Sequence, residues 1–146
     1  MAGLVQAIAS NSNYLLNIGP KADGTIPKWQ QDRLLAIGAW LKVNGEAVYN
    51  SQLWDISGDN QGNFFTLGQN SDLYISATSI NGTTLVVDAD IPVTDSTVIT
   101  LLGSDGAPVP FEKQGSKLLI NLPDNIFQGR NLKELYTQVL KVSTRE

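Results

Sequence analysis

The spacing of apolar residues changes near residue 44 and divides the sequence into two regimes. Residues 1–44 show a helical spacing, then a short apolar run, then a helical spacing again. Residues 45–146 carry many short apolar runs separated by Gly, Asn, Asp and Pro, as is typical of an antiparallel β-sandwich. The pattern predicts an α+β protein with one unit over residues 1–44 and a β-sandwich over residues 45–146.

The first unit is predicted to have the order helix, strand, helix. Leu4, Val5 and Ile8 suit the last turns of an amphipathic helix. Tyr14–Ile18 is an apolar run between turn-forming residues, which indicates a buried parallel strand. The unit therefore looks like a β/α unit whose neighbouring strands are missing.

A turn and a second helix follow. Asp23-Gly24 makes the turn, Thr25 is a good N-cap, Pro27 suits the first helical turn, and Asn44-Gly45 would end the helix. The apolar positions of this helix are Leu34, Ile37 and Leu41, widened by Trp29, Leu35 and Trp40.

The second unit is predicted to consist of short strands. The candidates are Ala47–Tyr49, Asn63–Leu67, Leu73–Ser79, Thr84–Asp90, Thr97–Leu102, Val109–Phe111, Lys117–Leu122 and Leu135–Val142. Asn81-Gly82 is a strong two-residue hairpin signal, and Ser104–Gly106 and Gln114–Ser116 are further turns. Asn81-Gly82-Thr83 also matches the N-glycosylation pattern, which matters only in a eukaryotic secretory setting.

The composition argues against several classes of partner and of catalytic or metal site. The net charge of −4, with only 10 Lys+Arg and no basic block, argues against nucleic acid and anionic membranes as partners. The chain has no Cys and no His, which excludes disulfides, thiolate chemistry, a Ser-His-Asp triad and a His-based zinc site. We therefore expect no metal site and no cofactor.

Fourteen carboxylates are present, and a pair of carboxylates could hydrolyse a glycosidic bond. Most Asp residues, however, fall in or beside turns, where they cap and solvate the backbone. Glu46 is better explained by a structural role at the junction of the two units, and Asp23 by its turn. The sequence thus predicts no catalytic residue.

Trp54 is the aromatic residue best placed to stack on a sugar ring, because it lies in an apparently irregular segment. Aromatic residues of a small sandwich more often belong to its core. If Trp54 does stack, the chain could instead be a non-catalytic carbohydrate-binding or interaction module.

Asn17 ends the predicted strand at residues 14–18. In a parallel β/α barrel, the C-terminal ends of the strands face the active site, and Asn17 would direct an amide towards it. The equally weighted alternative is that Asn17 bonds only to loop backbone. Lys21 fits a solvated loop position better than a ligand position.

The stretch NYLLNIGPKADGTIP (residues 13–27), followed by QQDRLLAIGAWLKVNGEAVYNS, resembles the C-terminal end of the catalytic barrel of retaining α-L-fucosidases, glycoside hydrolase family 29. Residues 97–122 resemble the sandwich that follows that barrel. The resemblance implies the last strand, loop and helix of a (β/α)8 barrel, then a C-terminal β-sandwich. It places Asn17, Gly19, Pro20, Lys21 and Asp23 nearest the substrate.

The chain departs from the family pattern at Lys28, where an acidic residue usually completes a capping box with Thr25. The family's nucleophile, acid/base and fucose-binding histidines lie upstream of this segment, and none can be carried over. The resemblance thus implies the C-terminal part of an enzyme that hydrolyses terminal α-linked L-fucose with retention. The chain alone is expected to be inactive.

Partners and location follow from the same resemblance. Fucosylated glycans would be reached through the intact enzyme, which in this family is secreted, periplasmic or lysosomal, although the chain shows no signal-peptide pattern. A parallel strand without neighbours leaves unpaired backbone and an apolar face. Tyr14–Ile18 is therefore expected to pair with a complementing polypeptide, to dimerise, or to fold back on the sandwich.

Overall fold

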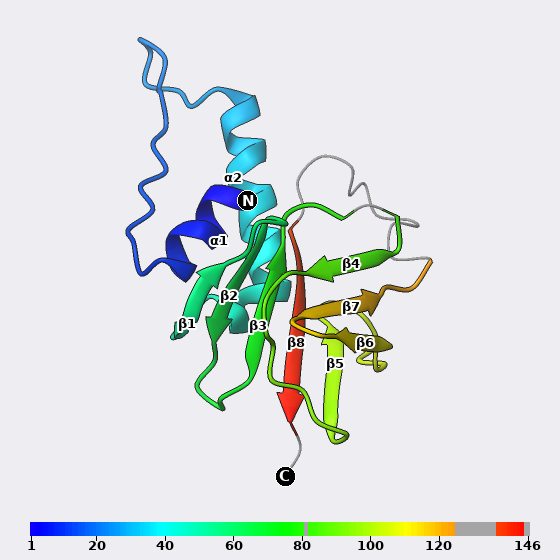
Figure 1. Ribbon diagram of the computed structural model, residues 1–146. Coiled ribbons are helices and arrows are strands. Elements are labelled where there is room, and N and C mark those ends of the chain that lie inside the picture. The colour runs from blue at the N-terminus through cyan, green and yellow to red at the C-terminus, as the bar shows by residue number, and fades with distance from the viewer. Residues whose placement is uncertain (81, 125–136, 145–146) are drawn as a thin grey trace.

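The computed structural model describes residues 1–80, 82–124 and 137–144, which form three layers (Figure 1). Two helices, α1 (Ala2–Ala9) and α2 (Lys28–Asn44), form the first layer, and a 3-10 turn, η1 (Gly45–Ala47), follows α2 directly. A five-stranded antiparallel sheet lies in the middle, and a three-stranded antiparallel sheet lies on its other side. The predicted α+β class with an antiparallel sandwich is confirmed.

The strand order of the five-stranded sheet is β1-β2-β3-β8-β5, and that of the smaller sheet is β4-β7-β6. The strands are β1 (Gln52–Gly58), β2 (Asn63–Leu67), β3 (Leu73–Ala77), β4 (Thr84–Val87), β5 (Thr97–Leu101), β6 (Phe111–Gln114), β7 (Lys117–Asn121) and β8 (Gln138–Thr144). Figure 1 shows the smaller sheet running across the larger one.

Alternation along the strands divides the buried side chains between two cores. In β3, Leu73, Ile75 and Ala77 face the smaller sheet, while Tyr74 faces the helices. Since both faces of the five-stranded sheet are covered, every residue of β3 is buried. The helix-side core joins Tyr74 to α1, α2 and η1 through Val5, Trp40, Ala47 and Val139.

Several local expectations were wrong. Ala47–Tyr49 is not a strand, because the helix continues into η1 and a turn. Asn81-Gly82 is not a hairpin tip: β3 pairs with β2 and β8, whereas β4 pairs with β7 in the other sheet. Asn81 itself, and residues 135–136 of the last predicted strand, lie outside the described residues. The turn predicted at Gln114–Ser116 is confirmed, since β6 and β7 pair and are joined by a turn over Gly115-Ser116.

One predicted strand begins later than expected, and one strand was not predicted. The strand predicted over Val109–Phe111 begins at Phe111, and before it Pro108 makes only an isolated bridge to Thr100 of β5. β1 was not predicted, because its polar residues and its exposed position at the sheet edge leave no apolar alternation to detect.

Residues 14–18 form no strand in the structure, contrary to the sequence pattern. They run extended along the outside, where Leu15 is 93% exposed. A strand needs a neighbouring backbone, and the described residues offer none beside this segment. The N-cap also differs: α2 begins after Pro27, because the Thr25 hydroxyl donates to Asp23 instead of capping the helix.

Neither helix in the described ranges combines the length and the apolar character that crossing a membrane requires.

Candidate functional site

The segment that leads into α2 is tied to that helix at Gly19. Its backbone N–H donates to Gln30 Oε1 (2.8 Å), and Gln30 Nε2 donates back to the Gly19 carbonyl (3.3 Å). One side-chain amide thus bonds both backbone groups of Gly19, much as a neighbouring strand would. We call this pair of bonds the Gln30 clamp; it fixes the end of residues 14–18 relative to α2.

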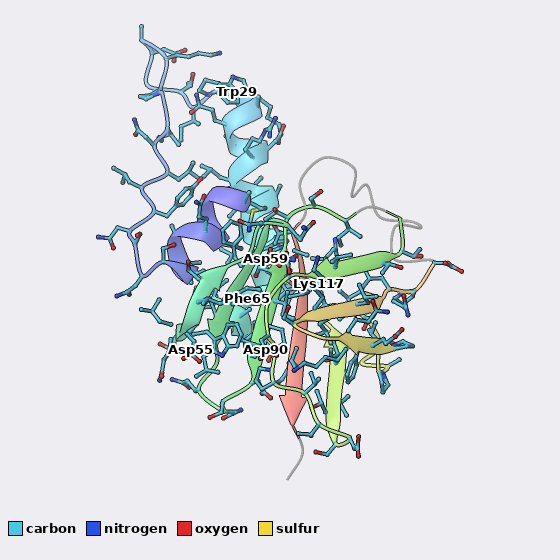
Figure 2. The ribbon with its side chains drawn as sticks, in the orientation of Figure 1. Trp29, Asp55, Asp59, Phe65, Asp90 and Lys117 are labelled. Carbon is cyan, nitrogen blue, oxygen red and sulfur yellow. The ribbon has the colours of Figure 1, made fainter. Side chains whose placement is uncertain are left out.

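Beside the Gln30 clamp lies an apolar groove of about 420 Å³ between residues 16–19 and α2. Its lining includes Leu16, Asn17, Ile18, Trp29, Leu34 and Ile37. Trp29 is 66% exposed, and Figure 2 shows it at the start of α2, away from the sheets. The helical seam expected at Leu34 and Ile37 is therefore present but only partly covered.

Residues 21–25 form a tight turn, as expected from Asp23-Gly24. Gly24 has a positive φ of 81°, and Lys21 N–H donates to the Thr25 carbonyl (2.9 Å). Hydrogen bonds from the Thr25 hydroxyl (2.7 Å) and the Thr25 N–H (2.9 Å) hold the pKa of the exposed Asp23 carboxyl below its usual value. Asp23 is thus occupied as a turn residue.

A polar cluster connects η1, at the end of α2, to the face of the five-stranded sheet that the helices cover. Lys141 Nζ lies 3.0 Å from Asp72 and 3.5 Å from Glu46, and the Tyr74 hydroxyl donates to Glu46 (3.3 Å). The bond to Asp72 raises the pKa of Lys141, and burial together with Glu46 raises the pKa of the Tyr74 hydroxyl. Glu46 thus has a structural role, since it joins η1 to the five-stranded sheet, while its place at a junction of two units stays a prediction.

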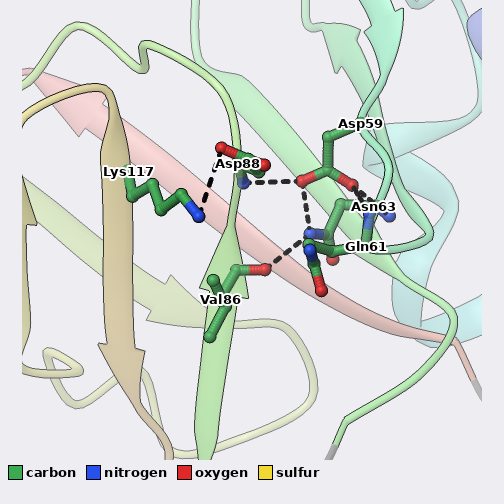
Figure 3. A network of polar contacts seen from close by, with 6 residues as sticks. All are labelled: Asp59, Gln61, Asn63, Val86, Asp88 and Lys117. Carbon is green, nitrogen blue, oxygen red and sulfur yellow. Dashed lines mark hydrogen bonds and ion pairs between the residues drawn. The ribbon is translucent and has the colours of Figure 1, made fainter.

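A second polar network ties the two sheets together at Asp59 (Figure 3). Its Oδ1 accepts from the N–H groups of Gln61 and Asn63 (both 2.9 Å), and its Oδ2 accepts from Asn63 Nδ2 (2.7 Å) and the N–H of Asp88 (2.8 Å). Asn63 Nδ2 also reaches the Val86 carbonyl in β4 (2.9 Å). With both oxygens occupied by donors, Asp59 is a cross-link and not a general base.

Trp54, the sugar-stacking candidate, lies in β1 and not in an irregular segment. It is half-buried, and its ring meets Phe65 edge-on at a centroid distance of 5.2 Å. This contact attaches Trp54 to the core between the sheets. A stacking role for Trp54 stays a prediction.

Asn17, Gly19, Pro20, Lys21 and Asp23 all lie on the exposed segment between the two helices. Asn17 and Gly19 both line the groove, whereas Lys21 and Asp23 belong to the turn beyond it. Across the described ranges no group of three or more acidic side chains could hold a metal ion. Neither the Gln30 clamp nor the Asp59 cross-link was predicted from the sequence, since the clamp bridges a loop and the cross-link joins the two sheets.

Comparison with known proteins gives this architecture a family. The family model that matches residues 1–46 is described as α-L-fucosidase. Tissue α-L-fucosidase of Mus musculus is 40% identical over 126 residues, and the Homo sapiens protein is 39% identical over 124 residues. The chain belongs to the α-L-fucosidase family. It corresponds to the C-terminal portion of these relatives, as the sequence motifs indicated.

Solved structures agree over nearly the whole chain. An α-fucosidase of Thermotoga maritima, in complex with fucose, matches with a TM-score of 0.75 and 28% identity, covering 97% of this chain and 32% of its own. An α-L-fucosidase GH29 from Bacteroides thetaiotaomicron matches with a TM-score of 0.67 and 25% identity, covering 96% of this chain and 30% of its own.

The matches cover most of this chain but only part of each relative. The mouse and human matches include 82% of this chain but only 27% and 26% of those proteins. The chain therefore spans about a quarter of the length of the curated relatives it matches. Within the family, the chain corresponds to one portion of these longer proteins.

Proposed function

We propose that this chain works as the C-terminal portion of an α-L-fucosidase that hydrolyses terminal α-linked L-fucose with retention. The observation that carries the proposal is the match to the C-terminal portion of the tissue α-L-fucosidases, over 82% of this chain. In a retaining glycosidase, two carboxyl groups about 5–5.5 Å apart act as nucleophile and acid/base. In this proposal both groups come from the remaining portion of the enzyme.

The contacts of this chain's own carboxylates support the proposal that the two catalytic carboxyl groups come from the remaining portion of the enzyme. Asp59 accepts from backbone and amide N–H groups on both oxygens, and Glu46 and Asp72 share the Lys141 ammonium. Asp23 accepts from Thr25. Each of these acidic groups already serves the fold, so we expect no fucosidase activity from the 146-residue chain alone.

The chain's own contribution would be to complete the catalytic unit. Asn17, Gly19 and Pro20 would lie at its substrate end, with Lys21 and Asp23 in the adjoining turn. Their exposure and the Gln30 clamp, which fixes their position on α2, support this placement. The complementing polypeptide is the preferred partner, with fucosylated glycans as the substrate class.

The test uses the Thermotoga maritima α-fucosidase, with its matched C-terminal region replaced by this chain. An aryl α-L-fucoside is assayed with the chimera, with the bacterial enzyme lacking that region, with this chain alone, and with the two pieces mixed. We expect activity in the chimera and none in either separate piece. A well-folded chimera without fucosidase activity would overturn the proposal, and activity of the mixture would show that the pieces also assemble without a covalent link.

A further inference from the structure

A polar pocket lies where the C-terminal end of α1 meets the start of β1, two elements that Figure 1 shows side by side. Its volume is about 540 Å³, within the range of about 300–1,000 Å³ that is usual for ligand sites. Its polar lining comes from both elements, with Asn11 and Ser12 after α1 and Ser51 and Gln52 at β1. The pocket shares no lining residue with the groove beside the Gln30 clamp.

The backbone on both sides of the pocket forms a turn with one residue of positive φ. Asn11 has a φ of 50°, and the Ser12 N–H closes the end of α1 by donating to the Ala7 carbonyl (2.7 Å). On the other side, Asn50 has a φ of 57° directly before Ser51. Residues other than glycine rarely adopt this conformation, so each turn has a defined shape. The two walls are therefore formed before any ligand binds.

Two side-chain amides at the pocket have no protein partner. Over the ranges that the structure describes, neither Asn11 nor Gln52 makes a side-chain hydrogen bond, and both residues are exposed. The hydroxyls of Ser12 and Ser51 donate to backbone carbonyls of their own turns (3.3 and 3.0 Å), which leaves only their acceptor lone pairs for a ligand. A carboxamide both donates and accepts. The matching ligand must therefore carry donors as well as acceptors.

The rest of the lining is apolar. It consists of Ile8, Val48 and Leu53, and Leu53 is 53% exposed. Among the described residues, none with a charged or an aromatic side chain lines the pocket, and Trp54 is not part of it. An ionic ligand would find no counter-charge there, and a flat aromatic ligand would find no ring to stack on. A neutral molecule with several hydroxyl groups and a C–H face fits, and this is the chemistry of a sugar ring.

We propose that this pocket binds one neutral sugar unit of a glycan. The amides of Asn11 and Gln52 exchange hydrogen bonds with the sugar hydroxyls, and the hydroxyls of Ser12 and Ser51 accept from them. A C–H face of the ring lies against Leu53. This inference goes beyond the proposed function and does not depend on it, because binding to the 146-residue chain requires no hydrolysis of fucose.

Nuclear magnetic resonance titration of the 146-residue chain tests the site with two neutral probes, fucosyllactose and maltotriose. We expect the amide signals of Asn11 and Gln52 to shift with at least one sugar and to saturate at about 1–10 mM, as suits an open site with few hydrogen bonds. Glycerol should leave these signals in place, because it is too small to contact both amides at once. Absence of a shift with either sugar up to about 100 mM, or equal shifts with glycerol, would overturn the proposal.

Two asparagines with positive φ provide a matched pair of variants. Asn11→Gly and Asn50→Gly each remove one exposed amide at a backbone conformation that glycine adopts readily, but of the two only Asn11 lines the pocket. Asn11→Gly should weaken sugar binding at least about threefold, since hydrogen bonds to the sugar are lost. Asn50→Gly should leave binding unchanged, and both variants should melt within about 2 °C of the unmodified chain. Equal dissociation constants for the two variants would contradict the site.

Gln52→Ala tests the second amide. Gln52 pairs with Leu67 of β2 through its backbone, so the substitution keeps the strand and should weaken binding at least about threefold. Combined with Asn11→Gly, the loss should reach about tenfold. Gln69→Ala removes an exposed glutamine outside the lining and should change nothing, so an equal loss there would refute the assignment. An active chimera together with a chain that binds neither sugar would refute this site and leave the proposed function standing.

Discussion

At Asp59 a single carboxylate holds the turn between β1 and β2 against β4 of the other sheet. All four of its hydrogen bonds come from N–H donors, so the site requires an acceptor on both oxygens. Asp59→Asn keeps the shape but turns an amide N–H₂ towards one pair of donors. We expect the free energy of unfolding to fall by about 1–3 kcal/mol, measured by urea denaturation.

Asp105→Asn is the matched control for that substitution. The Asp105 carboxylate is exposed and accepts from the Ala107 N–H (3.0 Å), a bond that an amide oxygen can also accept. We expect a change within about 0.5 kcal/mol. If the two variants lost equal stability, the Asp59 network would not be the cross-link that its geometry describes.

At the scale of elements, α2 is attached to the sheet through Trp40. The side chain is 5% exposed, packs against α1, η1 and the sheet, and donates from Nε1 to the Thr137 carbonyl (2.8 Å). Trp40→Phe removes buried apolar volume and leaves that carbonyl unpaired. We expect a loss of about 2–3 kcal/mol in the free energy of unfolding, measured by denaturant titration.

The same substitution at Trp29 provides the control on the same helix. Trp29 is 66% exposed in this chain, so Trp29→Phe should change the free energy of unfolding by less than about 0.5 kcal/mol. A comparable loss at both positions would mean that α2 is not held through Trp40.

The elements that could be predicted from sequence are those whose burial leaves a pattern along the chain. Asn63–Leu67 was predicted with the bounds of β2, and β3, β5 and β7 differ from their predictions only at the ends, because their side chains face a core. β1 gave no such pattern. The Asn81-Gly82 signal failed because it is local, while pairing is decided by the sheet in which each strand is buried.

The candidate site shows the same limit. The motifs of residues 13–27 identified the family, and Asp23-Gly24 identified its turn. Tyr14–Ile18 has the composition of a buried strand, yet it stays exposed because no backbone in the described ranges pairs with it. The Gln30 clamp closes an irregular loop, and the cluster around Lys141 joins residues that are distant in sequence, so no spacing rule reveals either one.

At the scale of the whole molecule, the helix layer meets the sheet at Tyr74 and Lys141, and both have a pKa above the ordinary values of 10.0 and 10.5. A raised pKa in the folded state favours the protonated form, so the stabilisation is complete below about pH 10 and is lost as the pH rises through the folded values. Deprotonation would remove the Lys141 cation from Asp72 and place a Tyr74 anion beside Glu46. We therefore expect the free energy of unfolding to decline above about pH 10, in urea titrations from pH 8 to 11.5.

Tyr74→Phe separates this cause from general alkaline denaturation. The variant retains the ring in the helix-side core but has no hydroxyl to ionise, so its decline should start at a higher pH and be shallower. Tyr49→Phe, at a tyrosine that is 60% exposed, should follow the unmodified chain. If Tyr74→Phe and the unmodified chain declined together, the alkaline transition would not arise at Tyr74. If Lys141→Met shifted the alkaline transition instead, the ion pairs of Lys141 with Asp72 and Glu46 would be its cause.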